Sequence, residues 1–228
     1  MKTFHYFLLA ALGFYSISSK AQIFKNSTWG ITTGISNTNV GYIKPFSRYS
    51  ITGFKVGVYG LKELNTNYEL TFAVNASRYG QRTYLTTRFI SPPNLDTTFY
   101  NMYEEYFTYL TFYPQLRYYP LKFGKIKPFI GFGLFAGYLI KSKGFSYTGD
   151  GLLISTTVQT RGFYRLNYGV NLDLGLKIHL GKLKKPVWVA LSYEPGIADI
   201  VHSRSKNPGF TYKTSAYSLN VYYPISSR

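Results

Sequence analysis

Residues 164–180 read YRLNYGVNLDLGLKIHL, and every second residue of this stretch is apolar or aromatic. The intervening positions carry Arg165, Asp173 and Lys177 together with asparagines, glycines and a histidine. Because successive side chains of a strand point to opposite faces, this pattern predicts a β-strand and excludes a helix. The strand is much longer than the five or six residues typical of soluble sheets. One apolar face and one charged face are typical of a wall between lipid and a polar interior.

The same alternation recurs along the chain. It is clear in residues 52–58, 68–77, 130–140 and 215–225, and weaker in residues 29–35, 106–118 and 187–197. The links between these eight segments alternate in length, with short links at 61–67, 120–126 and 181–186 and longer ones at 37–50, 80–103, 141–161 and 199–213. We therefore predict an all-β fold, an eight-stranded antiparallel up-and-down transmembrane β-barrel with short periplasmic turns and longer extracellular loops.

Aromatic residues at the predicted strand ends indicate two girdles at the membrane surfaces. On the turn side they are Trp29, Tyr59, Tyr68, Tyr118 and Trp188, and on the loop side Tyr106, Tyr138, Tyr164, Tyr193 and Tyr217. The alternative is a secreted soluble barrel of the lipocalin type, with an apolar interior and a polar exterior. Long apolar rows flanked by aromatic residues favour the barrel with lipid outside.

The N-terminus has the pattern of a secretory signal peptide. Lys2 supplies the positive charge, residues 7–15 (FLLAALGFY) form the apolar core, and Ser19-Lys20-Ala21 resembles a cleavage site. An anchor helix is the alternative, but about nine apolar residues are too few to cross a hydrocarbon core of roughly 30 Å. We predict a signal peptide at residues 1–21, a barrel domain at residues 22–228, and a location in the bacterial outer membrane.

The chain has a formal net charge of +17, from 26 Lys+Arg and 9 Asp+Glu, and it has no cysteine. Without cysteine there is no disulfide framework, so backbone hydrogen bonds and packing must hold the fold. The lysines gather in turns, for example at Lys122, Lys125 and Lys127, rather than along one face. Contact with the phosphates of outer-membrane lipid or lipopolysaccharide is therefore expected, and nucleic acid is not.

The inward-facing positions are expected to carry a balanced network of charges, which are Lys55, Arg117, Arg165 and Lys177 against Glu69, Glu105, Asp173 and Glu194. An eight-stranded barrel has room for side chains and little else, and buried charges must be paired. The register predicts Lys55 near Glu194 and Asp173, and a direct pair between Glu69 and Arg117. We therefore expect a packed, salt-bridged interior rather than a water-filled pore.

The sequence predicts no catalytic, metal or cofactor site. His5, His179 and His202 lack the spacing of convergent metal ligands. Asp199, His202 and Ser203 could form a hydrolase or acyltransferase triad, which is a minor alternative. We predict a non-enzymatic surface or envelope-complex barrel that acts through its loops or its wall. The alternative is a narrow channel or transport protein, which single-channel conductance would distinguish.

Several motifs resemble the PorT-like outer-membrane barrel family of Bacteroidota-type bacteria. They are residues 109–114 (YLTFYP), Arg117-Tyr118, Lys127-Pro128-Phe129 with the glycines that precede Tyr138-Leu139, and residues 191–200 (LSYEPGIADI). The resemblance implies the barrel fold and the outer membrane. It also implies dependence on the barrel-insertion machinery and a partner in an envelope or secretion complex.

Overall fold

The computed structural model describes residues 27–41, 48–91, 95–121, 124–148, 150–158, 163–179, 185–200 and 213–226. The predicted signal peptide and the candidate residues His202 and Ser203 lie outside this part of the chain. Nine strands are present in it: β1 (Ser27–Gly41), β2 (Arg48–Glu63), β3 (Tyr68–Ser91), β4 (Leu95–Tyr118), β5 (Ile126–Thr148), β6 (Leu153–Val158), β7 (Leu166–Ile178), β8 (Val187–Pro195) and β9 (Lys213–Ser226). No helix among the described residues is long and apolar enough to span a membrane.

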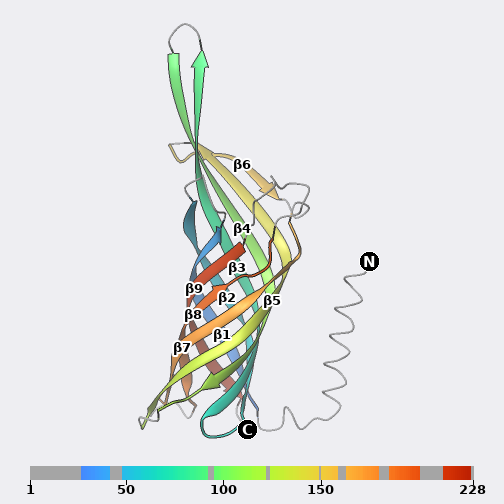
Figure 1. Cartoon of the computed structure of the whole chain (residues 1–228), viewed down its shortest axis with the longest axis vertical. Helices are drawn as coiled ribbons and strands as arrows, with labels where there is room; N and C mark the ends of the chain where they lie inside the picture. The colour runs from blue at the N-terminus through green and yellow to red at the C-terminus, as the bar shows by residue number, and fades with distance from the viewer. Residues whose placement is uncertain are drawn as a thin grey trace, which may run out of the picture.

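Eight of these strands close into the predicted barrel (Figure 1). The ring runs β1, β2, β3, β4, β5, β7, β8, β9 and back to β1, and every neighbouring pair is antiparallel. The ninth strand, β6, lies in the 141–161 link, which we expected to be a loop. It pairs with β5 from Lys143 to Tyr147. There β5 extends past its last pair with β7, Tyr138–Leu166, so its edge is open.

The 80–103 link is also not a loop, which corrects the sequence-based expectation. β3 and β4 stay paired from Tyr79–Phe107 out to Ser91–Leu95, and this hairpin projects beyond the barrel (Figure 1). Alternation is weak there because a hairpin outside the barrel is not required to bury one face. We call this end of the barrel the hairpin end, and the end with the short links the turn end.

The apolar faces of the strands point outwards. On β5, Phe129 and Phe135 are buried, whereas Ile130, Phe132 and Leu134 are 55%, 60% and 56% exposed. Charged residues such as Lys55 and Glu194 lie inside. This arrangement is the reverse of a soluble lipocalin-type barrel, so that alternative is wrong.

The aromatic girdles follow the prediction except at Tyr59 and Trp188, and at Tyr106, which is only partly exposed at the hairpin end. Trp29, Tyr68 and Tyr118 are exposed at the turn end, and Tyr138, Tyr164, Tyr193 and Tyr217 at the hairpin end. Tyr59 and Trp188 are instead fully buried inside the barrel. They lie at inward-facing positions of β2 and β8, and their rings pack edge to face with centroids 6.2 Å apart.

Candidate functional site: the barrel interior and its mouth

An ion pair between β2 and β8 occupies the middle of the barrel. Lys55 Nζ contacts Glu194 Oε1 and donates to Ser218 Oγ at 3.1 Å. The hydroxyls of Tyr79 and Tyr113 donate to Glu194 Oε2 at 3.0 and 3.2 Å. The Lys55 ammonium also lies 5.3 Å from the centre of the Tyr113 ring. Both oxygens of the buried carboxylate are thus satisfied, as a buried charge requires.

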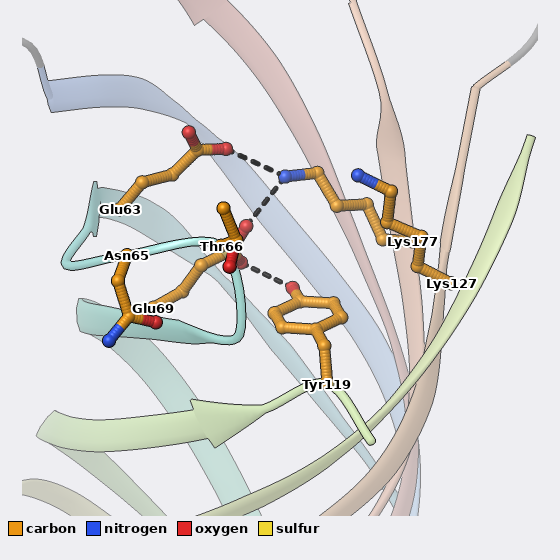
Figure 2. Close-up of a pocket in the computed structure, with 7 residues that line it drawn as sticks. All are labelled: Glu63, Asn65, Thr66, Glu69, Tyr119, Lys127 and Lys177. Atoms are coloured by element: carbon orange, nitrogen blue, oxygen red, sulfur yellow. Dashed lines mark hydrogen bonds and ion pairs between the residues drawn. The ribbon is translucent and has the colours of Figure 1, made fainter. Parts of the chain in front are cut away.

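A second network lies at the turn end (Figure 2). Lys177 Nζ on β7 donates to Glu69 Oε1 at 2.6 Å and to Glu63 Oε1 at 2.9 Å. The Tyr119 hydroxyl donates to Glu69 Oε2. Trp188 Nε1 donates to the Tyr119 hydroxyl at 3.0 Å. The buried Glu69 therefore ties together β3, the residue after β4, and β7.

This network borders a cavity of about 200 Å³ at the turn end, which we call the mouth cavity. Its lining is polar: Glu63, Asn65, Thr66, Glu69, Tyr119, Lys127 and Lys177 (Figure 2). Deeper in the barrel, a second cavity beside Lys55 and Glu194 has a volume of only about 10 Å³. A space of that size holds a single water molecule at most. Side chains thus fill the middle of the barrel beyond the mouth cavity.

The predicted ion pair between Glu69 and Arg117 is wrong. Arg117 lies directly opposite Glu69 in the β3–β4 register, yet Glu69 pairs with Lys177 instead. The fully buried Arg117 donates from Nε to Gln115 Oε1 at 2.9 Å. Its guanidinium lies over the rings of Tyr222 and Phe129, at 4.3 and 4.8 Å. Two aromatic faces hold the cation by cation–π attraction, which draws it away from Glu69.

Asp173 is the remaining buried carboxylate of the barrel interior, 3% exposed. It lies in the same cross-strand row as Arg117: Arg117 on β4 pairs with Gly131 on β5, which pairs with Asp173 on β7. Neither carboxylate oxygen has a hydrogen-bond partner among the described residues. Arg117 and Asp173 interact electrostatically without direct contact. They balance each other's charge across Gly131, where the Gln115 side chain fills the space that a larger residue would occupy.

Two predicted members of the network lie elsewhere. Arg165 is exposed and donates to the Tyr138 hydroxyl at 2.6 Å on the outer face, because β7 begins only at Leu166 and the chain bends before it. Glu105 is half-buried at the hairpin end and accepts from Gln81 Nε2 at 2.5 Å. The buried interior charges are therefore Lys55, Arg117 and Lys177 against Glu69, Asp173 and Glu194. The interior stays balanced, with three cations and three carboxylates.

Four aromatic donors of these networks were not predicted as such from the sequence: Tyr79, Tyr113, Tyr119 and Trp188. Tyr113 lies an even number of residues from Arg117 on β4, and Tyr79 an even number from Glu69 on β3, so both tyrosines are on the inward face. This spacing could have identified them. Tyr119 gave no such signal, because it lies just after β4 ends. Among the described residues, no group of three His, Cys, Asp or Glu side chains could hold a metal ion.

A separate polar cluster lies on β3 and β4 at the hairpin end, where β2 and β5 still flank them. Arg82 donates to Glu104 Oε1 from Nε at 2.8 Å and from Nη2 at 2.6 Å. This carboxylate raises the pKa of the Arg82 guanidinium. The Tyr106 hydroxyl donates to Glu104 Oε2 at 3.0 Å. Burial, and then this hydrogen bond, raises the pKa of Tyr106. Glu104 thus has both oxygens engaged.

A closed antiparallel barrel with an apolar outer wall, aromatic girdles and a charged, filled interior defines an integral protein of the bacterial outer membrane. The family model of the outer membrane protein beta-barrel domain matches residues 16–202. The chain belongs to this family.

Solved structures of outer-membrane barrels are similar over most of their length. Neisserial surface protein A has 13% identity and a TM-score of 0.42, covering 86% of this chain and 97% of its own. The outer membrane enzyme PagL has 15% identity and a TM-score of 0.41, covering 86% and 99%. OprG from Pseudomonas aeruginosa has 14% identity and a TM-score of 0.36, covering 87% and 91%. No curated protein matches the chain. Identities this low carry no information about activity or ligand.

Proposed function

We propose that this protein is a non-enzymatic, non-conducting barrel that serves as a surface or envelope-complex component, PorT-like and associated with secretion. The observation that supports this proposal is the filled interior. The cavity beside Lys55 and Glu194 has a volume of only about 10 Å³, and three buried cations balance three buried carboxylates along the interior. A barrel without an open path must act through the parts that face its surroundings.

The part best suited to contact a partner is the β3–β4 hairpin. β2 pairs with β3 only as far as Thr83, and β5 pairs with β4 only as far as Asn101. Beyond these residues the two strands pair with each other, from Leu85–Asn101 to Ser91–Leu95, and with no other strand in the described part of the chain. With respect to the described residues, both outer edges therefore present unpaired backbone N–H and C=O groups. Such edges accept an extended segment of another protein as an added strand.

Single-channel recording on the purified, refolded barrel tests the closed interior. We expect no steady conductance of porin size in planar lipid bilayers. A steady current of that size from the unmodified protein would contradict the proposal.

Crosslinking in cells tests the hairpin. A photo-crosslinking residue in place of Tyr84, on the hairpin, should capture an envelope protein. The same residue in place of Asn65, in a turn, should not capture that protein. Replacement of residues 86–100 by an Asn-Gly turn should abolish the capture while the barrel still folds, because this dipeptide suits a two-residue hairpin. Equal capture from both positions would rule out the hairpin as the docking element.

A narrow channel is the second candidate, and the mouth cavity is the observation that favours it. The cavity of about 200 Å³ opens at the turn end, and Lys127 and Lys177 line it. For the barrel to conduct as a channel, the side chains around Lys55 would have to move out of its path. A steady current that appears in a Lys55→Ala, Glu194→Ala variant and is absent from the parent would place the closure at this pair.

A further inference from the structure

A cluster of cations lies on the outer wall at the hairpin end, just beyond the lipid-facing band. Arg78 on β3, Thr108 on β4 and Lys141 on β5 form one cross-strand row. Gly80, Tyr106 and Lys143 form the next row out. We call Arg78, Lys141 and Lys143 the outer cation cluster. Figure 1 shows β3, β4 and β5 side by side at this end.

A β-bulge places the two lysines on the outside. The β4–β5 register shifts where Thr108 pairs with Lys141 but Tyr109 pairs with Leu139, so Ile140 is an extra residue in β5. Leu139 and Ser142 are buried, whereas Ile140 and Lys141 are both exposed. Without the bulge, the alternation of residues 130–140 would turn Lys141 and Lys143 inwards. Bulges commonly re-aim side chains in this way.

Arg78 is held in position at the same site. Its guanidinium lies 3.9 Å from the centre of the Tyr106 ring and 5.9 Å from that of Phe54. Gly80 makes room for this stacking, because a Cβ atom there would come within 3.1 Å of the Tyr106 ring. Stacking on two rings restricts the Arg78 side chain, so less conformational freedom is lost when it binds an anion.

The outer cation cluster has no anionic partner in the part of the chain that the structure describes. On this face of the sheet the carboxylate nearest in register is Glu104, one row further out, and Arg82 and Tyr106 occupy both of its oxygens. Like charges on neighbouring positions of one sheet face repel. An anion placed between them would therefore be bound favourably.

The surface next to the cluster is apolar. On the side towards the membrane, Leu110 and Tyr138 form the adjacent cross-strand pair, 49% and 40% exposed, and the bulged Ile140 is 56% exposed. Neighbouring strands lie about 4.8 Å apart, so Arg78 and Lys141 are roughly 10 Å apart across Thr108, close enough for both side chains to reach one phosphate. A ligand that fits both surfaces has a phosphate headgroup and hydrocarbon chains.

We infer that this surface is a binding site for a phosphate-bearing membrane lipid. Arg78, Lys141 and Lys143 bind the phosphate, Thr108 donates a hydroxyl, and the acyl chains lie against Leu110, Tyr138 and Ile140. The site is separate from the hairpin edges and does not depend on the proposed docking of a partner.

Native mass spectrometry of the full barrel in uncharged detergent micelles tests this inference, with short-chain phosphatidic acid as the probe. We expect one tightly bound phosphatidic acid, and no comparable binding of diacylglycerol or of inorganic phosphate. The K141Q/K143Q variant should lose about tenfold or more in affinity, because each charge-assisted hydrogen bond contributes on that scale. R78K, which keeps the charge but loses the planar fork, should also bind more weakly.

The matched control is K62Q/K125Q, which removes the same charge at the turn end and should keep the parent affinity. Unboiled gel mobility verifies that each variant folds. Equal loss in K62Q/K125Q and K141Q/K143Q would mean that the net charge alone attracts the lipid, and would overturn the inference. Parent affinity in both K141Q/K143Q and R78K, or binding of inorganic phosphate as tight as that of the lipid, would overturn it as well.

Discussion

Lys55 on β2 and Glu194 on β8 form an ion pair inside the barrel, although 139 positions separate them in the sequence. Both side chains are almost completely buried, at 3% and 2% exposure. The two strands are not neighbours, since β1 and β9 lie between them, so the pair links separate parts of the wall across the interior. It forms the centre of the packed interior, and its removal should affect the whole barrel.

Lys55→Met should destabilise the barrel by about 3–5 kcal/mol, because Glu194 would be left buried without its cation. Lys62→Met removes the same kind of side chain near the turn end and should cost less than about 1 kcal/mol. Urea unfolding of the refolded proteins in lipid vesicles measures both. In the Lys55→Met, Glu194→Gln variant much of the loss should be recovered. Equal stability of the two Met variants would refute the packed interior.

Glu69→Gln should be far more destabilising than Glu63→Gln, although both carboxylates bind Lys177. The Glu69 side chain is 4% exposed and that of Glu63 is 67% exposed. A buried pair broken on one side costs about 3–5 kcal/mol, whereas an exposed pair contributes about 1 kcal/mol or less. The same urea titrations give the comparison. Similar losses in the two variants would show that water reaches Glu69 freely.

Gly175→Ala should destabilise the barrel by about 1–3 kcal/mol through overpacking. A Cβ at Gly175 would lie 2.4 Å from Phe129 Cζ and 2.5 Å from the Val189 carbonyl oxygen. At Gly144 the nearest atoms are 4.0 Å away, so Gly144→Ala is the control and should be neutral or slightly stabilising. Thermal unfolding followed by circular dichroism measures the difference. A neutral Gly175→Ala would mean that the Phe129 ring moves freely.

The hairpin end should face the cell exterior and the turn end the periplasm. The chain has no cysteine, so single-cysteine variants report topology without background. Ser155→Cys on the exposed β6 should react with a membrane-impermeant maleimide on intact cells. Asn65→Cys should react only after the outer membrane is ruptured. The reverse pattern would invert the topology.

The mature protein should begin at Gln22, since Ser19-Lys20-Ala21 resembles a cleavage site. The intact mass of protein extracted from outer membranes measures this directly. A mass that includes residues before Gln22 would contradict the signal-peptide prediction.

The sequence by itself predicted the eight-stranded barrel and divided each strand into two faces, and it favoured lipid on the apolar face; the burial of the charged face in the structure decided between the two arrangements. In residues 164–180 and 130–140 the apolar period of two is a local property, because each residue's face follows from its position along one strand. The inward placement of Lys55, Glu69, Arg117, Asp173, Lys177 and Glu194 followed from the same alternation.

Only the tertiary structure decided how these residues combine. Glu69 and Arg117 are opposite each other in register, but cation–π contacts with Phe129 and Tyr222 hold Arg117, and Lys177 reaches Glu69 from another strand. Alternation also cannot show where a strand ends, so it placed Arg165 inside the barrel although the residue is exposed. Nor can it show a bulge, so the outward orientation of Lys141 and Lys143 after the extra residue Ile140 was not predicted. The physical reason is that the position of a residue along its own strand decides which face it lies on. The partner of that residue depends instead on the register and packing of strands that are distant in the sequence.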